Sequence, residues 1–218
     1  MTQRTRVAIV EDHRLLAHSV GLALRAEGLD VVTADLSGED ALLQSLAPSS
    51  DLLVLLDLDL GEPLVDGVRL IPVLRARDAR VLVVTGTTER LRIAAAVEAG
   101  AIGYVAKLEP FDVLLARVLQ AVRGEQVLDE CERHELLASL RAARKDTQQR
   151  LAPFRQLTPK ETRVLDELAR GKSVESIAAE WVVSEATVRT QVRGVLTKLD
   201  VRSQLAAVAK ARAAGWHP

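Results

Sequence analysis

A short apolar run that ends in two carboxylates constrains this chain more than any other stretch. Residues 52–60 read LLVLLDLDL, and the first five are apolar without alternation, which is typical of a parallel strand buried on both faces. Asp57 and Asp59 follow, and Gly61 and Pro63 then indicate a loop. Because the reactive groups of an open α/β sheet gather at the carboxyl ends of its strands, Asp57 is a candidate nucleophile or metal ligand. The alternative is an ordinary carboxylate at a solvated strand end.

The first 124 residues repeat this arrangement, with five apolar runs that are each followed by an amphipathic stretch. Strands are expected near residues 7–10, 30–34, 52–56, 81–84 and 102–106, and helices near residues 14–27, 38–47, 65–77, 88–99 and 110–124. Ser37 and either Thr87 or Thr88 are candidate N-caps, and Pro72 argues against an unbroken third helix. The alternation predicts an α/β fold with right-handed crossovers and a parallel sheet.

Candidate reactive side chains follow four of the five predicted strands. Glu11 and Asp12 follow the first, Asp57 the third, Thr85 the fourth and Lys107 the fifth. Carboxylates held together repel one another unless a cation lies among them, and Mg2+ suits such a site. Asp57 could then attack a phosphoryl group whose oxygens Thr85 and Lys107 bind. Each residue also has an ordinary explanation, as a first-turn acid, a helix-entry hydroxyl or a solvated lysine, but their shared position at one sheet edge makes coincidence the weaker explanation.

The order and spacing of these residues resemble the receiver domain of bacterial two-component response regulators, over about residues 4–124. The resemblance implies a flavodoxin-like, five-stranded parallel (βα)5 domain in which a histidine kinase phosphorylates Asp57. It also implies that Asp12 binds Mg2+ directly and that Glu11 binds it through water. The backbone carbonyl of Asp59 would complete the metal site.

The same resemblance implies a switch beside the phosphorylation site. Thr85 and Lys107 would bind the transferred phosphoryl group, and Tyr104 lies at the position of the switch aromatic, three residues before the lysine. The alternative for Tyr104 is an ordinary half-buried strand residue. Asp59 and Thr87 resemble the positions that tune phosphate hydrolysis in this family, so we expect them to modulate the lifetime of the phosphorylated state.

Residues 125–155 connect this domain to a separate C-terminal segment. Residues 129–149 are charged, rich in Ala and Leu and free of Gly and Pro, which predicts a helix. Packing of this helix against its own protein is favoured over a free spacer or a dimer contact. Cys131 is the only cysteine, which excludes a disulfide framework within the chain and a cysteine-based zinc site. The histidines show no ligand spacing and are interpreted as surface residues: His13, His18, His134 and His217.

Residues 156–218 carry clear signals for short helices. Thr158, Pro159 and Glu161 form a predicted capping box, and Ser173, Ser184 and Ser203 are further candidate helix starts. Two of these helices meet at a tight Val182-Val183 corner and resemble a helix-turn-helix, whose second helix enters the major groove of DNA. The alternative is an ordinary helical bundle with a polar face.

The detailed pattern of residues 157–212 resembles the LuxR-type helix-turn-helix domain. Three positions of the second helix would face base edges in DNA: Arg189, Thr190 and Arg193. Three others would contact phosphates and position the domain: Thr187, Lys198 and Arg202. Loss of Arg193 is expected to cost about 1–3 kcal/mol at one base. Gln191 replaces the His that is usual in the family, which leaves the details of backbone contact open.

Charge divides along the chain in a way that fits two partners. The first 124 residues carry 13 basic and 17 acidic residues, whereas the last 63 carry 10 basic and 7 acidic residues. No stretch approaches the roughly 20 apolar residues of a membrane helix, and no secretory signal is present. The chain is therefore expected to be soluble and cytoplasmic, without a membrane partner.

A receiver followed by a LuxR-type reader resembles the NarL/FixJ class of response regulators. Phosphorylation of Asp57 is expected to control DNA binding, dimerisation and transcription, with a histidine kinase, double-stranded DNA and a second copy of the chain as partners. No enzyme activity is expected beyond self-catalysed phosphotransfer and slow autodephosphorylation. One alternative is a phosphohydrolase of the haloacid dehalogenase type, although here the acidic pair precedes Asp57 instead of following Lys107. Another is a regulator controlled by protein binding without phosphate.

Overall fold

The chain divides into two compact units, Met1–Arg141 and Ala142–Pro218, which are described separately. The computed structural model describes residues 5–46, 51–64 and 66–217. The division falls inside helix α6 (Glu130–Leu151), within the segment that the sequence assigns to a connector. The domain limits at residues 124 and 155 stay a prediction from the sequence.

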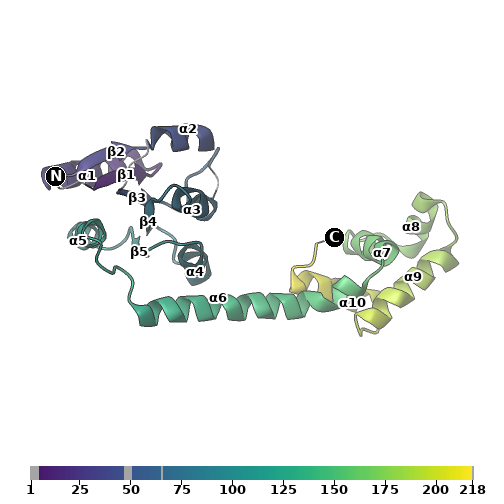
Figure 1. Cartoon of the computed structure of the whole chain (residues 1–218). Coiled ribbons are helices and arrows are strands. Elements are labelled where there is room, and N and C mark those ends of the chain that lie inside the picture. Colours follow the sequence, from purple (N-terminus) through teal and green to yellow (C-terminus); the bar gives the residue numbers. More distant parts are fainter. Residues whose placement is uncertain (1–4, 47–50, 65, 218) are drawn as a thin grey trace. The chain divides into compact units, whose positions relative to one another are not determined.

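The first unit is built on a parallel sheet whose strand order is β2-β1-β3-β4-β5 in the described residues (Figure 1). Its strands are β1 (Arg6–Val10), β2 (Asp30–Thr33), β3 (Leu52–Leu56), β4 (Arg80–Thr85) and β5 (Gly103–Ala106). The helices between and after them are α1 (Arg14–Ala26), α2 (Glu39–Ser45), α3 (Gly67–Arg75), α4 (Arg90–Glu98) and α5 (Phe111–Val122). The predicted alternation and the parallel sheet are confirmed.

Strand β3 lies at the centre of the sheet and explains the continuous apolar run. Leu53 and Leu55 point to the face that α1 and α5 cover, while Val54 and Leu56 point to the face that α2 and α3 cover. Every residue of the strand is at most 4% exposed. Because both faces are buried, no position in the strand tolerates a polar side chain until Asp57.

Two N-caps predicted from the sequence are wrong. Gly38 precedes α2, and the backbone N–H of Ser37 is bonded in a turn one residue earlier. Glu89 precedes α4 without a side-chain cap, because the hydroxyl of Thr87 already accepts the backbone N–H of Glu89. Ser and Thr can bond nearby backbone groups in turns as readily as at helix starts, and here the turns prevail.

Helix α3 has a cap that the sequence analysis did not identify. The side chain of Asp66 accepts the N–H of Val68 at 3.1 Å, and Pro72 lies inside the helix without ending it. The predicted helix limits at residues 47 and 65 lie outside the described residues. Asp66 also lies near the site described below.

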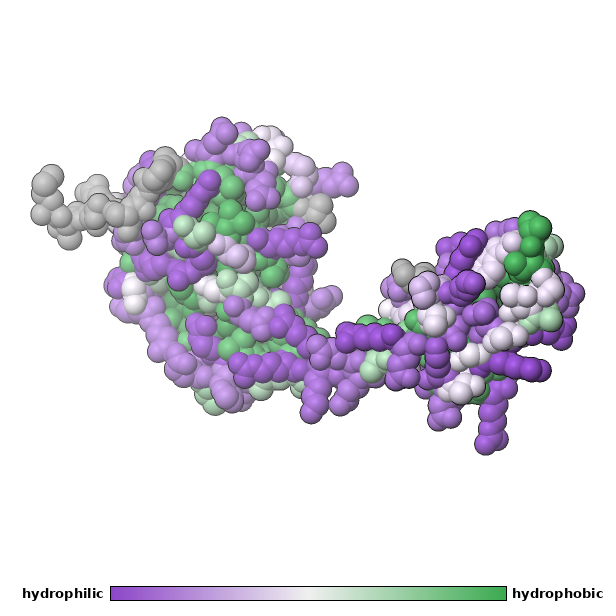
Figure 2. Space-filling view, turned by 45° about the vertical axis from the view of Figure 1, so that its right-hand side comes forward, coloured by the Kyte–Doolittle hydropathy of each residue, from purple (hydrophilic) through white to green (hydrophobic). Residues whose placement is uncertain are grey.

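The first half of α6 packs on α4. Leu136 and Leu140 are buried with Ile93 and Val97, which lie on α4. The expected packing of this helix against its own protein is confirmed for this part. Among the described residues, every helix is too short or too polar to cross a lipid bilayer. In the view of Figure 2, hydrophilic side chains cover most of the visible surface of each unit.

The second unit is a small helical domain. A short 3-10 helix, η1 (Ala152–Gln156), leads into α7 (Pro159–Ala169), α8 (Val174–Trp181), α9 (Glu185–Lys198) and α10 (Gln204–Ala214). All four predicted caps are confirmed: Thr158 with its full capping box, Ser173, Ser184 and Ser203. Buried aliphatic side chains of α7, α8 and α9 form one core cluster, and Phe154 stacks on Trp216 in a second.

Val182 ends α8 in a backbone conformation that disfavours β-branched residues. Its φ is +55° and its side chain is 89% exposed, so burial does not compensate for the left-handed geometry. We expect Val182→Asn to raise the free energy of unfolding of this unit by about 1 kcal/mol, because Asn tolerates this region. Trp181 and Trp216 both lie in this unit, so urea unfolding followed by tryptophan fluorescence measures the effect. Val183→Asn is the control for added polarity, and equal stabilisation by both changes would contradict the backbone explanation.

Candidate functional site

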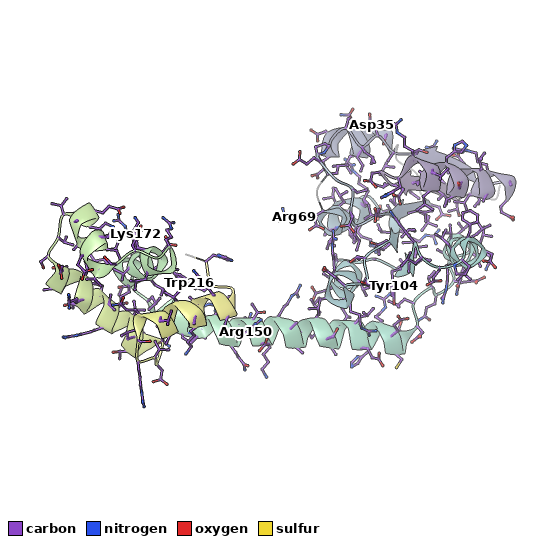
Figure 3. All side chains as sticks on the ribbon, turned by 180° about the vertical axis from the view of Figure 1, so that it is seen from behind. Asp35, Arg69, Tyr104, Arg150, Lys172 and Trp216 are labelled. Carbon is purple, nitrogen blue, oxygen red and sulfur yellow. The ribbon has the colours of Figure 1, made fainter. Side chains whose placement is uncertain are left out.

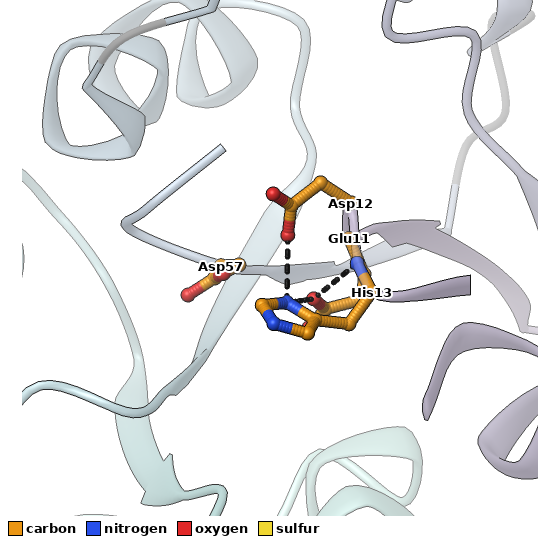
Figure 4. Close-up of side chains that lie close together, drawn as sticks. All are labelled: Glu11, Asp12, His13 and Asp57. Carbon is orange, nitrogen blue, oxygen red and sulfur yellow. Dashed lines mark hydrogen bonds and ion pairs between the residues drawn. The ribbon is translucent and has the colours of Figure 1, made fainter. Parts of the chain in front are cut away.

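The predicted acidic residues meet at the carboxyl edge of the sheet. Strands β1 and β3 are neighbours, with Val10 opposite Leu56, so the residues that follow each strand are adjacent. Glu11, Asp12, His13 and Asp57 each offer a ligand atom, and these atoms all lie within 4.8 Å of one another (Figure 4). Glu11 and Asp57 are buried, whereas Asp12 is exposed at the rim.

Lys107 joins this cluster from the end of β5. Its ammonium donates to Asp57 Oδ2 at 2.7 Å and to Glu11 Oε1 at 2.8 Å. Burial by itself lowers the pKa of Lys107, but the bonds to the two carboxylates outweigh it and the pKa is raised. Burial raises the pKa of Glu11 despite its bond to the lysine. The lysine therefore stays charged and balances part of the negative charge.

One oxygen of Asp57 has no partner. Asp57 Oδ1 is buried without a hydrogen bond in the described structure, while Oδ2 is bound to Lys107. Beside it, Thr85 is fully buried at the end of β4, and its hydroxyl accepts the backbone N–H of Thr87 at 3.2 Å. A buried carboxylate oxygen without a partner is costly unless a ligand or ion satisfies it. The oxygen-rich donor set fits a hard divalent cation such as Mg2+.

His13 belongs to the same cluster, although its sequence interpretation was only that of a surface residue. Its side chain is 71% exposed, and its Nδ1 lies 2.9 Å from Asp12 Oδ1 and 3.1 Å from Glu11 Oε1. The hydrogen bond to Asp12 raises the pKa of His13. Its place directly after the acidic pair is the one signal in the sequence that could have identified it. His18, His134 and His217 are exposed, as expected.

The side chain of Asp59 does not join the cluster. It is more than half exposed and binds the guanidinium of Arg92 on α4, which also donates to the carbonyl of Leu58 at 2.7 Å. No motif in the sequence pointed to Arg92, because the contact joins residues 33 positions apart. The predicted role of the Asp59 backbone carbonyl is not tested by this contact.

Tyr104 on β5 is half-buried and faces the first half of α6 (Figure 3). Its hydroxyl donates to Glu132 Oε1 at 2.6 Å, and this bond raises the pKa of Tyr104 to about 12. The tyrosine thus connects the strand that carries Lys107 to α6. Its predicted part in a switch stays a prediction.

The candidate DNA-binding residues lie on α9 or just after it, and several have partners within the second unit. Arg189 pairs with Glu185 at 2.9 Å and lies 3.7 Å from Glu175 on α8. Thr190 donates to the carbonyl of Ala186. Across the described part of the chain, no hydrogen bond or ion pair engages Arg193, which is exposed.

The three predicted phosphate contacts differ in their surroundings. Thr187 and Arg202 are exposed, and the hydroxyl of Thr187 lies 2.9 Å from that of Ser184. Lys198 donates at 2.6 Å to the buried capping-box carboxylate of Glu161. Burial raises the pKa of Glu161, but the bonds from Lys198 and Thr158 together outweigh it and the pKa is lowered. Lys198 therefore has a structural bond, which the sequence did not reveal.

Comparison with known families identifies both units. The family "Response regulator receiver domain" matches residues 7–119, and the family "Bacterial regulatory proteins, luxR family" matches residues 155–211. The first match spans more than half of the chain, so the chain belongs to the response regulator receiver family.

Similar proteins of known name show which class of response regulator the chain belongs to. Over 93% of its length the chain is 34% identical to the nitrate/nitrite response regulator protein NarP of Escherichia coli, and it covers 92% of that protein. Over 95% of its length it is 31% identical to a nitrate/nitrite response regulator protein homolog of Haemophilus influenzae, covering 96% of that protein. The chain is a two-component response regulator of the NarL/FixJ class, with a LuxR-type DNA-binding domain that controls transcription.

A solved structure shares the fold. RcsB from Salmonella enterica serovar Typhimurium, bound to a promoter in the presence of phosphomimetic BeF3-, aligns with a TM-score of 0.50 and 22% identity. The alignment covers 95% of this chain and 98% of that one. At this identity the likeness concerns the fold alone.

Proposed function

We propose that Asp57 accepts a phosphoryl group from a histidine kinase and that its phosphorylation controls DNA binding by the second unit. The observation that carries this proposal is the state of the Asp57 carboxylate. It is 2% exposed at the end of the central strand, with one oxygen held by Lys107 and the other without a partner. A carboxylate placed in this way can bind a cation through its free oxygen and attack phosphorus through the other oxygen, once Lys107 turns to the phosphoryl group.

A magnesium ion would be held by Glu11, Asp12 and Asp57, together with the backbone carbonyl of Asp59. When bound, it supplies positive charge that neutralises these carboxylates and the phosphoryl oxygens. The unpartnered Asp57 oxygen and the 4.8 Å cluster support this assignment.

Phosphotransfer then follows from the positions of the residues. An oxygen of Asp57 forms a bond to phosphorus while the bond from phosphorus to the histidine nitrogen of the kinase breaks, and the electron pair stays on that nitrogen. Lys107 and the hydroxyl of Thr85 bind the oxygens of the transferred group. The chain catalyses this transfer to itself and the slow hydrolysis that releases the phosphoryl group as inorganic phosphate, and Asp59 and Thr87 modulate that hydrolysis.

The second unit reads DNA through α9. Arg189, Thr190 and Arg193 contact base edges in the major groove, while Thr187, Lys198 and Arg202 contact phosphates. A dimer of the active form would read two half-sites about one helical turn apart. The exposure of Arg193 supports its role, since its guanidinium is available without first leaving a carboxylate.

The signal passes from Asp57 through Thr85 and Tyr104, and it shifts an equilibrium between two states of the protein. Moving such an equilibrium from 1:99 to 99:1 requires about 5.5 kcal/mol of differential stabilisation. The new bonds of the phosphoryl group to Thr85 and Lys107 supply this difference, and a bound Mg2+ would add positive charge that favours the same state. The hydrogen bond from Tyr104 to Glu132 supports a route from β5 to α6.

The test is DNA binding and oligomeric state of the full-length protein with and without BeF3- and Mg2+. We expect the mimic to increase both DNA affinity and the dimer fraction, measured by fluorescence anisotropy on promoter DNA of the host and by analytical ultracentrifugation. Mg2+ alone and BeF3- alone are the controls. No change in either quantity would instead favour a regulator controlled by protein binding without phosphate.

A further inference from the structure

Arg92 on α4 holds the segment that directly follows the phosphoacceptor. Its guanidinium donates to the carboxylate of Asp59 and, at 2.7 Å, to the carbonyl of Leu58. It also lies 3.7 Å from the carboxylate of Asp66, the cap of α3. Only 27% of the Arg92 side chain is exposed, against 55% for Asp59. A single guanidinium therefore joins α4 to both ends of the loop after β3.

The backbone of this segment does not depend on Arg92 alone. The carbonyl of Leu58 also accepts the backbone N–H of Gly67 at 3.0 Å, and the side chain of Leu58 is fully buried. Asp66 also accepts the backbone N–H of Val68, a bond that does not involve the arginine. What Arg92 uniquely controls is the carboxylate of Asp59, which makes no other hydrogen bond or ion pair in the described structure.

We propose that Arg92 is a positioning residue that prolongs the phosphorylated state by occupying the carboxylate of Asp59. This inference rests on the proposed phosphorylation of Asp57. Asp59 lies two residues beyond Asp57, in the loop that leaves the carboxyl edge of the sheet, and its side chain is more than half exposed to solvent.

Hydrolysis of the phosphorylated protein needs an oriented water molecule. The water oxygen forms a bond to phosphorus while the bond from phosphorus to the Asp57 oxygen breaks, and the electron pair returns to the Asp57 carboxylate. Inorganic phosphate leaves, and the proton lost by the water passes to solvent. A free carboxylate near this path accepts a hydrogen bond from the water and orients it. A carboxylate bound to a guanidinium is less available to do so.

The test compares two ways of breaking the same pair. In Arg92→Gln the carboxylate of Asp59 is free, whereas in Asp59→Asn no carboxylate remains. We expect Arg92→Gln to shorten the half-life of the phosphorylated full-length protein about tenfold, below the roughly 10²–10⁴-fold of full acid–base catalysis. Asp59→Asn should lengthen the half-life modestly, because the fraction of Asp59 carboxylate that is free of Arg92 at any moment is then lost. Decay is followed on phosphate-affinity gels after acetyl phosphate is removed in the presence of Mg2+.

A double variant that carries both Arg92→Gln and Asp59→Asn separates an effect of Arg92 through the Asp59 carboxylate from a general structural effect. If Arg92 acts through Asp59, Arg92→Gln changes nothing when Asp59 is already Asn, and Arg92→Lys restores part of the half-life in the natural background. Arg69→Gln is the matched control, because Arg69 is 89% exposed and lies 3.9 Å from Asp66 without contacting Asp59. Equal shortening in the single and double variants would overturn the role of Arg92 while leaving phosphorylation of Asp57 intact. Absence of phosphorylation in the natural protein would overturn both proposals.

Discussion

Replacing Asp57 with Asn is expected to abolish phosphorylation of the full-length protein by acetyl phosphate or by a histidine kinase. The amide nitrogen and oxygen of Asn cannot attack phosphorus as the carboxylate oxygen can, and the variant loses one negative charge from the cation site. Lys107 keeps Glu11 as a partner, so the receiver unit should stay folded. The measurement is incorporation of labelled phosphate in Mg2+, with circular dichroism to check the fold.

Asp59→Asn is the matched control for this prediction. It makes the same change of carboxylate to amide only two residues away, but in a side chain that faces Arg92 and lies outside the acidic cluster. We expect phosphorylation of this variant to persist. Normal incorporation in Asp57→Asn would show that a different carboxylate, such as Glu11 or Asp12, accepts the phosphoryl group.

Gly67→Ala is expected to destabilise the receiver unit by about 3 kcal/mol, the upper end of the usual cost of overpacking. A Cβ at Gly67 would lie 2.2 Å from the backbone oxygen of Asp57 and 2.8 Å from the Cα of Leu58. Both contacts are backbone atoms, so no side chain can rotate away. Either α3 must shift or Asp57 must move, and the second outcome would also slow the proposed phosphorylation.

The matched control for this change is Gly38→Ala. Gly38 lies at the start of α2, as Gly67 lies at the start of α3, but an added Cβ at Gly38 meets nothing within 4 Å, and its φ of 164° is extended backbone. We expect the control to change the unfolding free energy by less than about 0.5 kcal/mol. Urea unfolding followed by far-UV circular dichroism reports both units, while tryptophan fluorescence reports the second unit alone, where both tryptophans lie, so the transition seen only by dichroism is that of the receiver. Equal stability of the two variants would contradict the close approach of α3 to β3.

The meeting of the candidate site residues at one edge of the sheet could be predicted because it depends on chain connectivity. Once the apolar runs alternate with helical stretches, the strands are parallel and their carboxyl ends share one edge. Asp12, Asp57 and Lys107 were therefore expected together, and the bonds of Lys107 to Asp57 and Glu11 agree with this. The capping box at Thr158 could equally be predicted from the sequence, because all of its atoms belong to four consecutive residues.

Other features could not be predicted because they depend on how helices pack on the sheet. The bond from Arg92 to Asp59 and the bond from Lys198 to Glu161 join residues 33 and 37 positions apart, with no motif to mark them. The N-caps at Ser37 and Thr87 were mispredicted because local turns had already engaged these residues.

The sequence by itself determined which residues reach the carboxyl edge of the sheet, because the alternation of apolar runs with helical stretches makes the strands parallel. Only the tertiary structure decided which partners those residues have there. Whether Asp59 faces the acidic cluster or an arginine, and whether α3 leaves room for a side chain at Gly67, depends on distances between packed elements. Local sequence pattern and propensity carry no information about these distances.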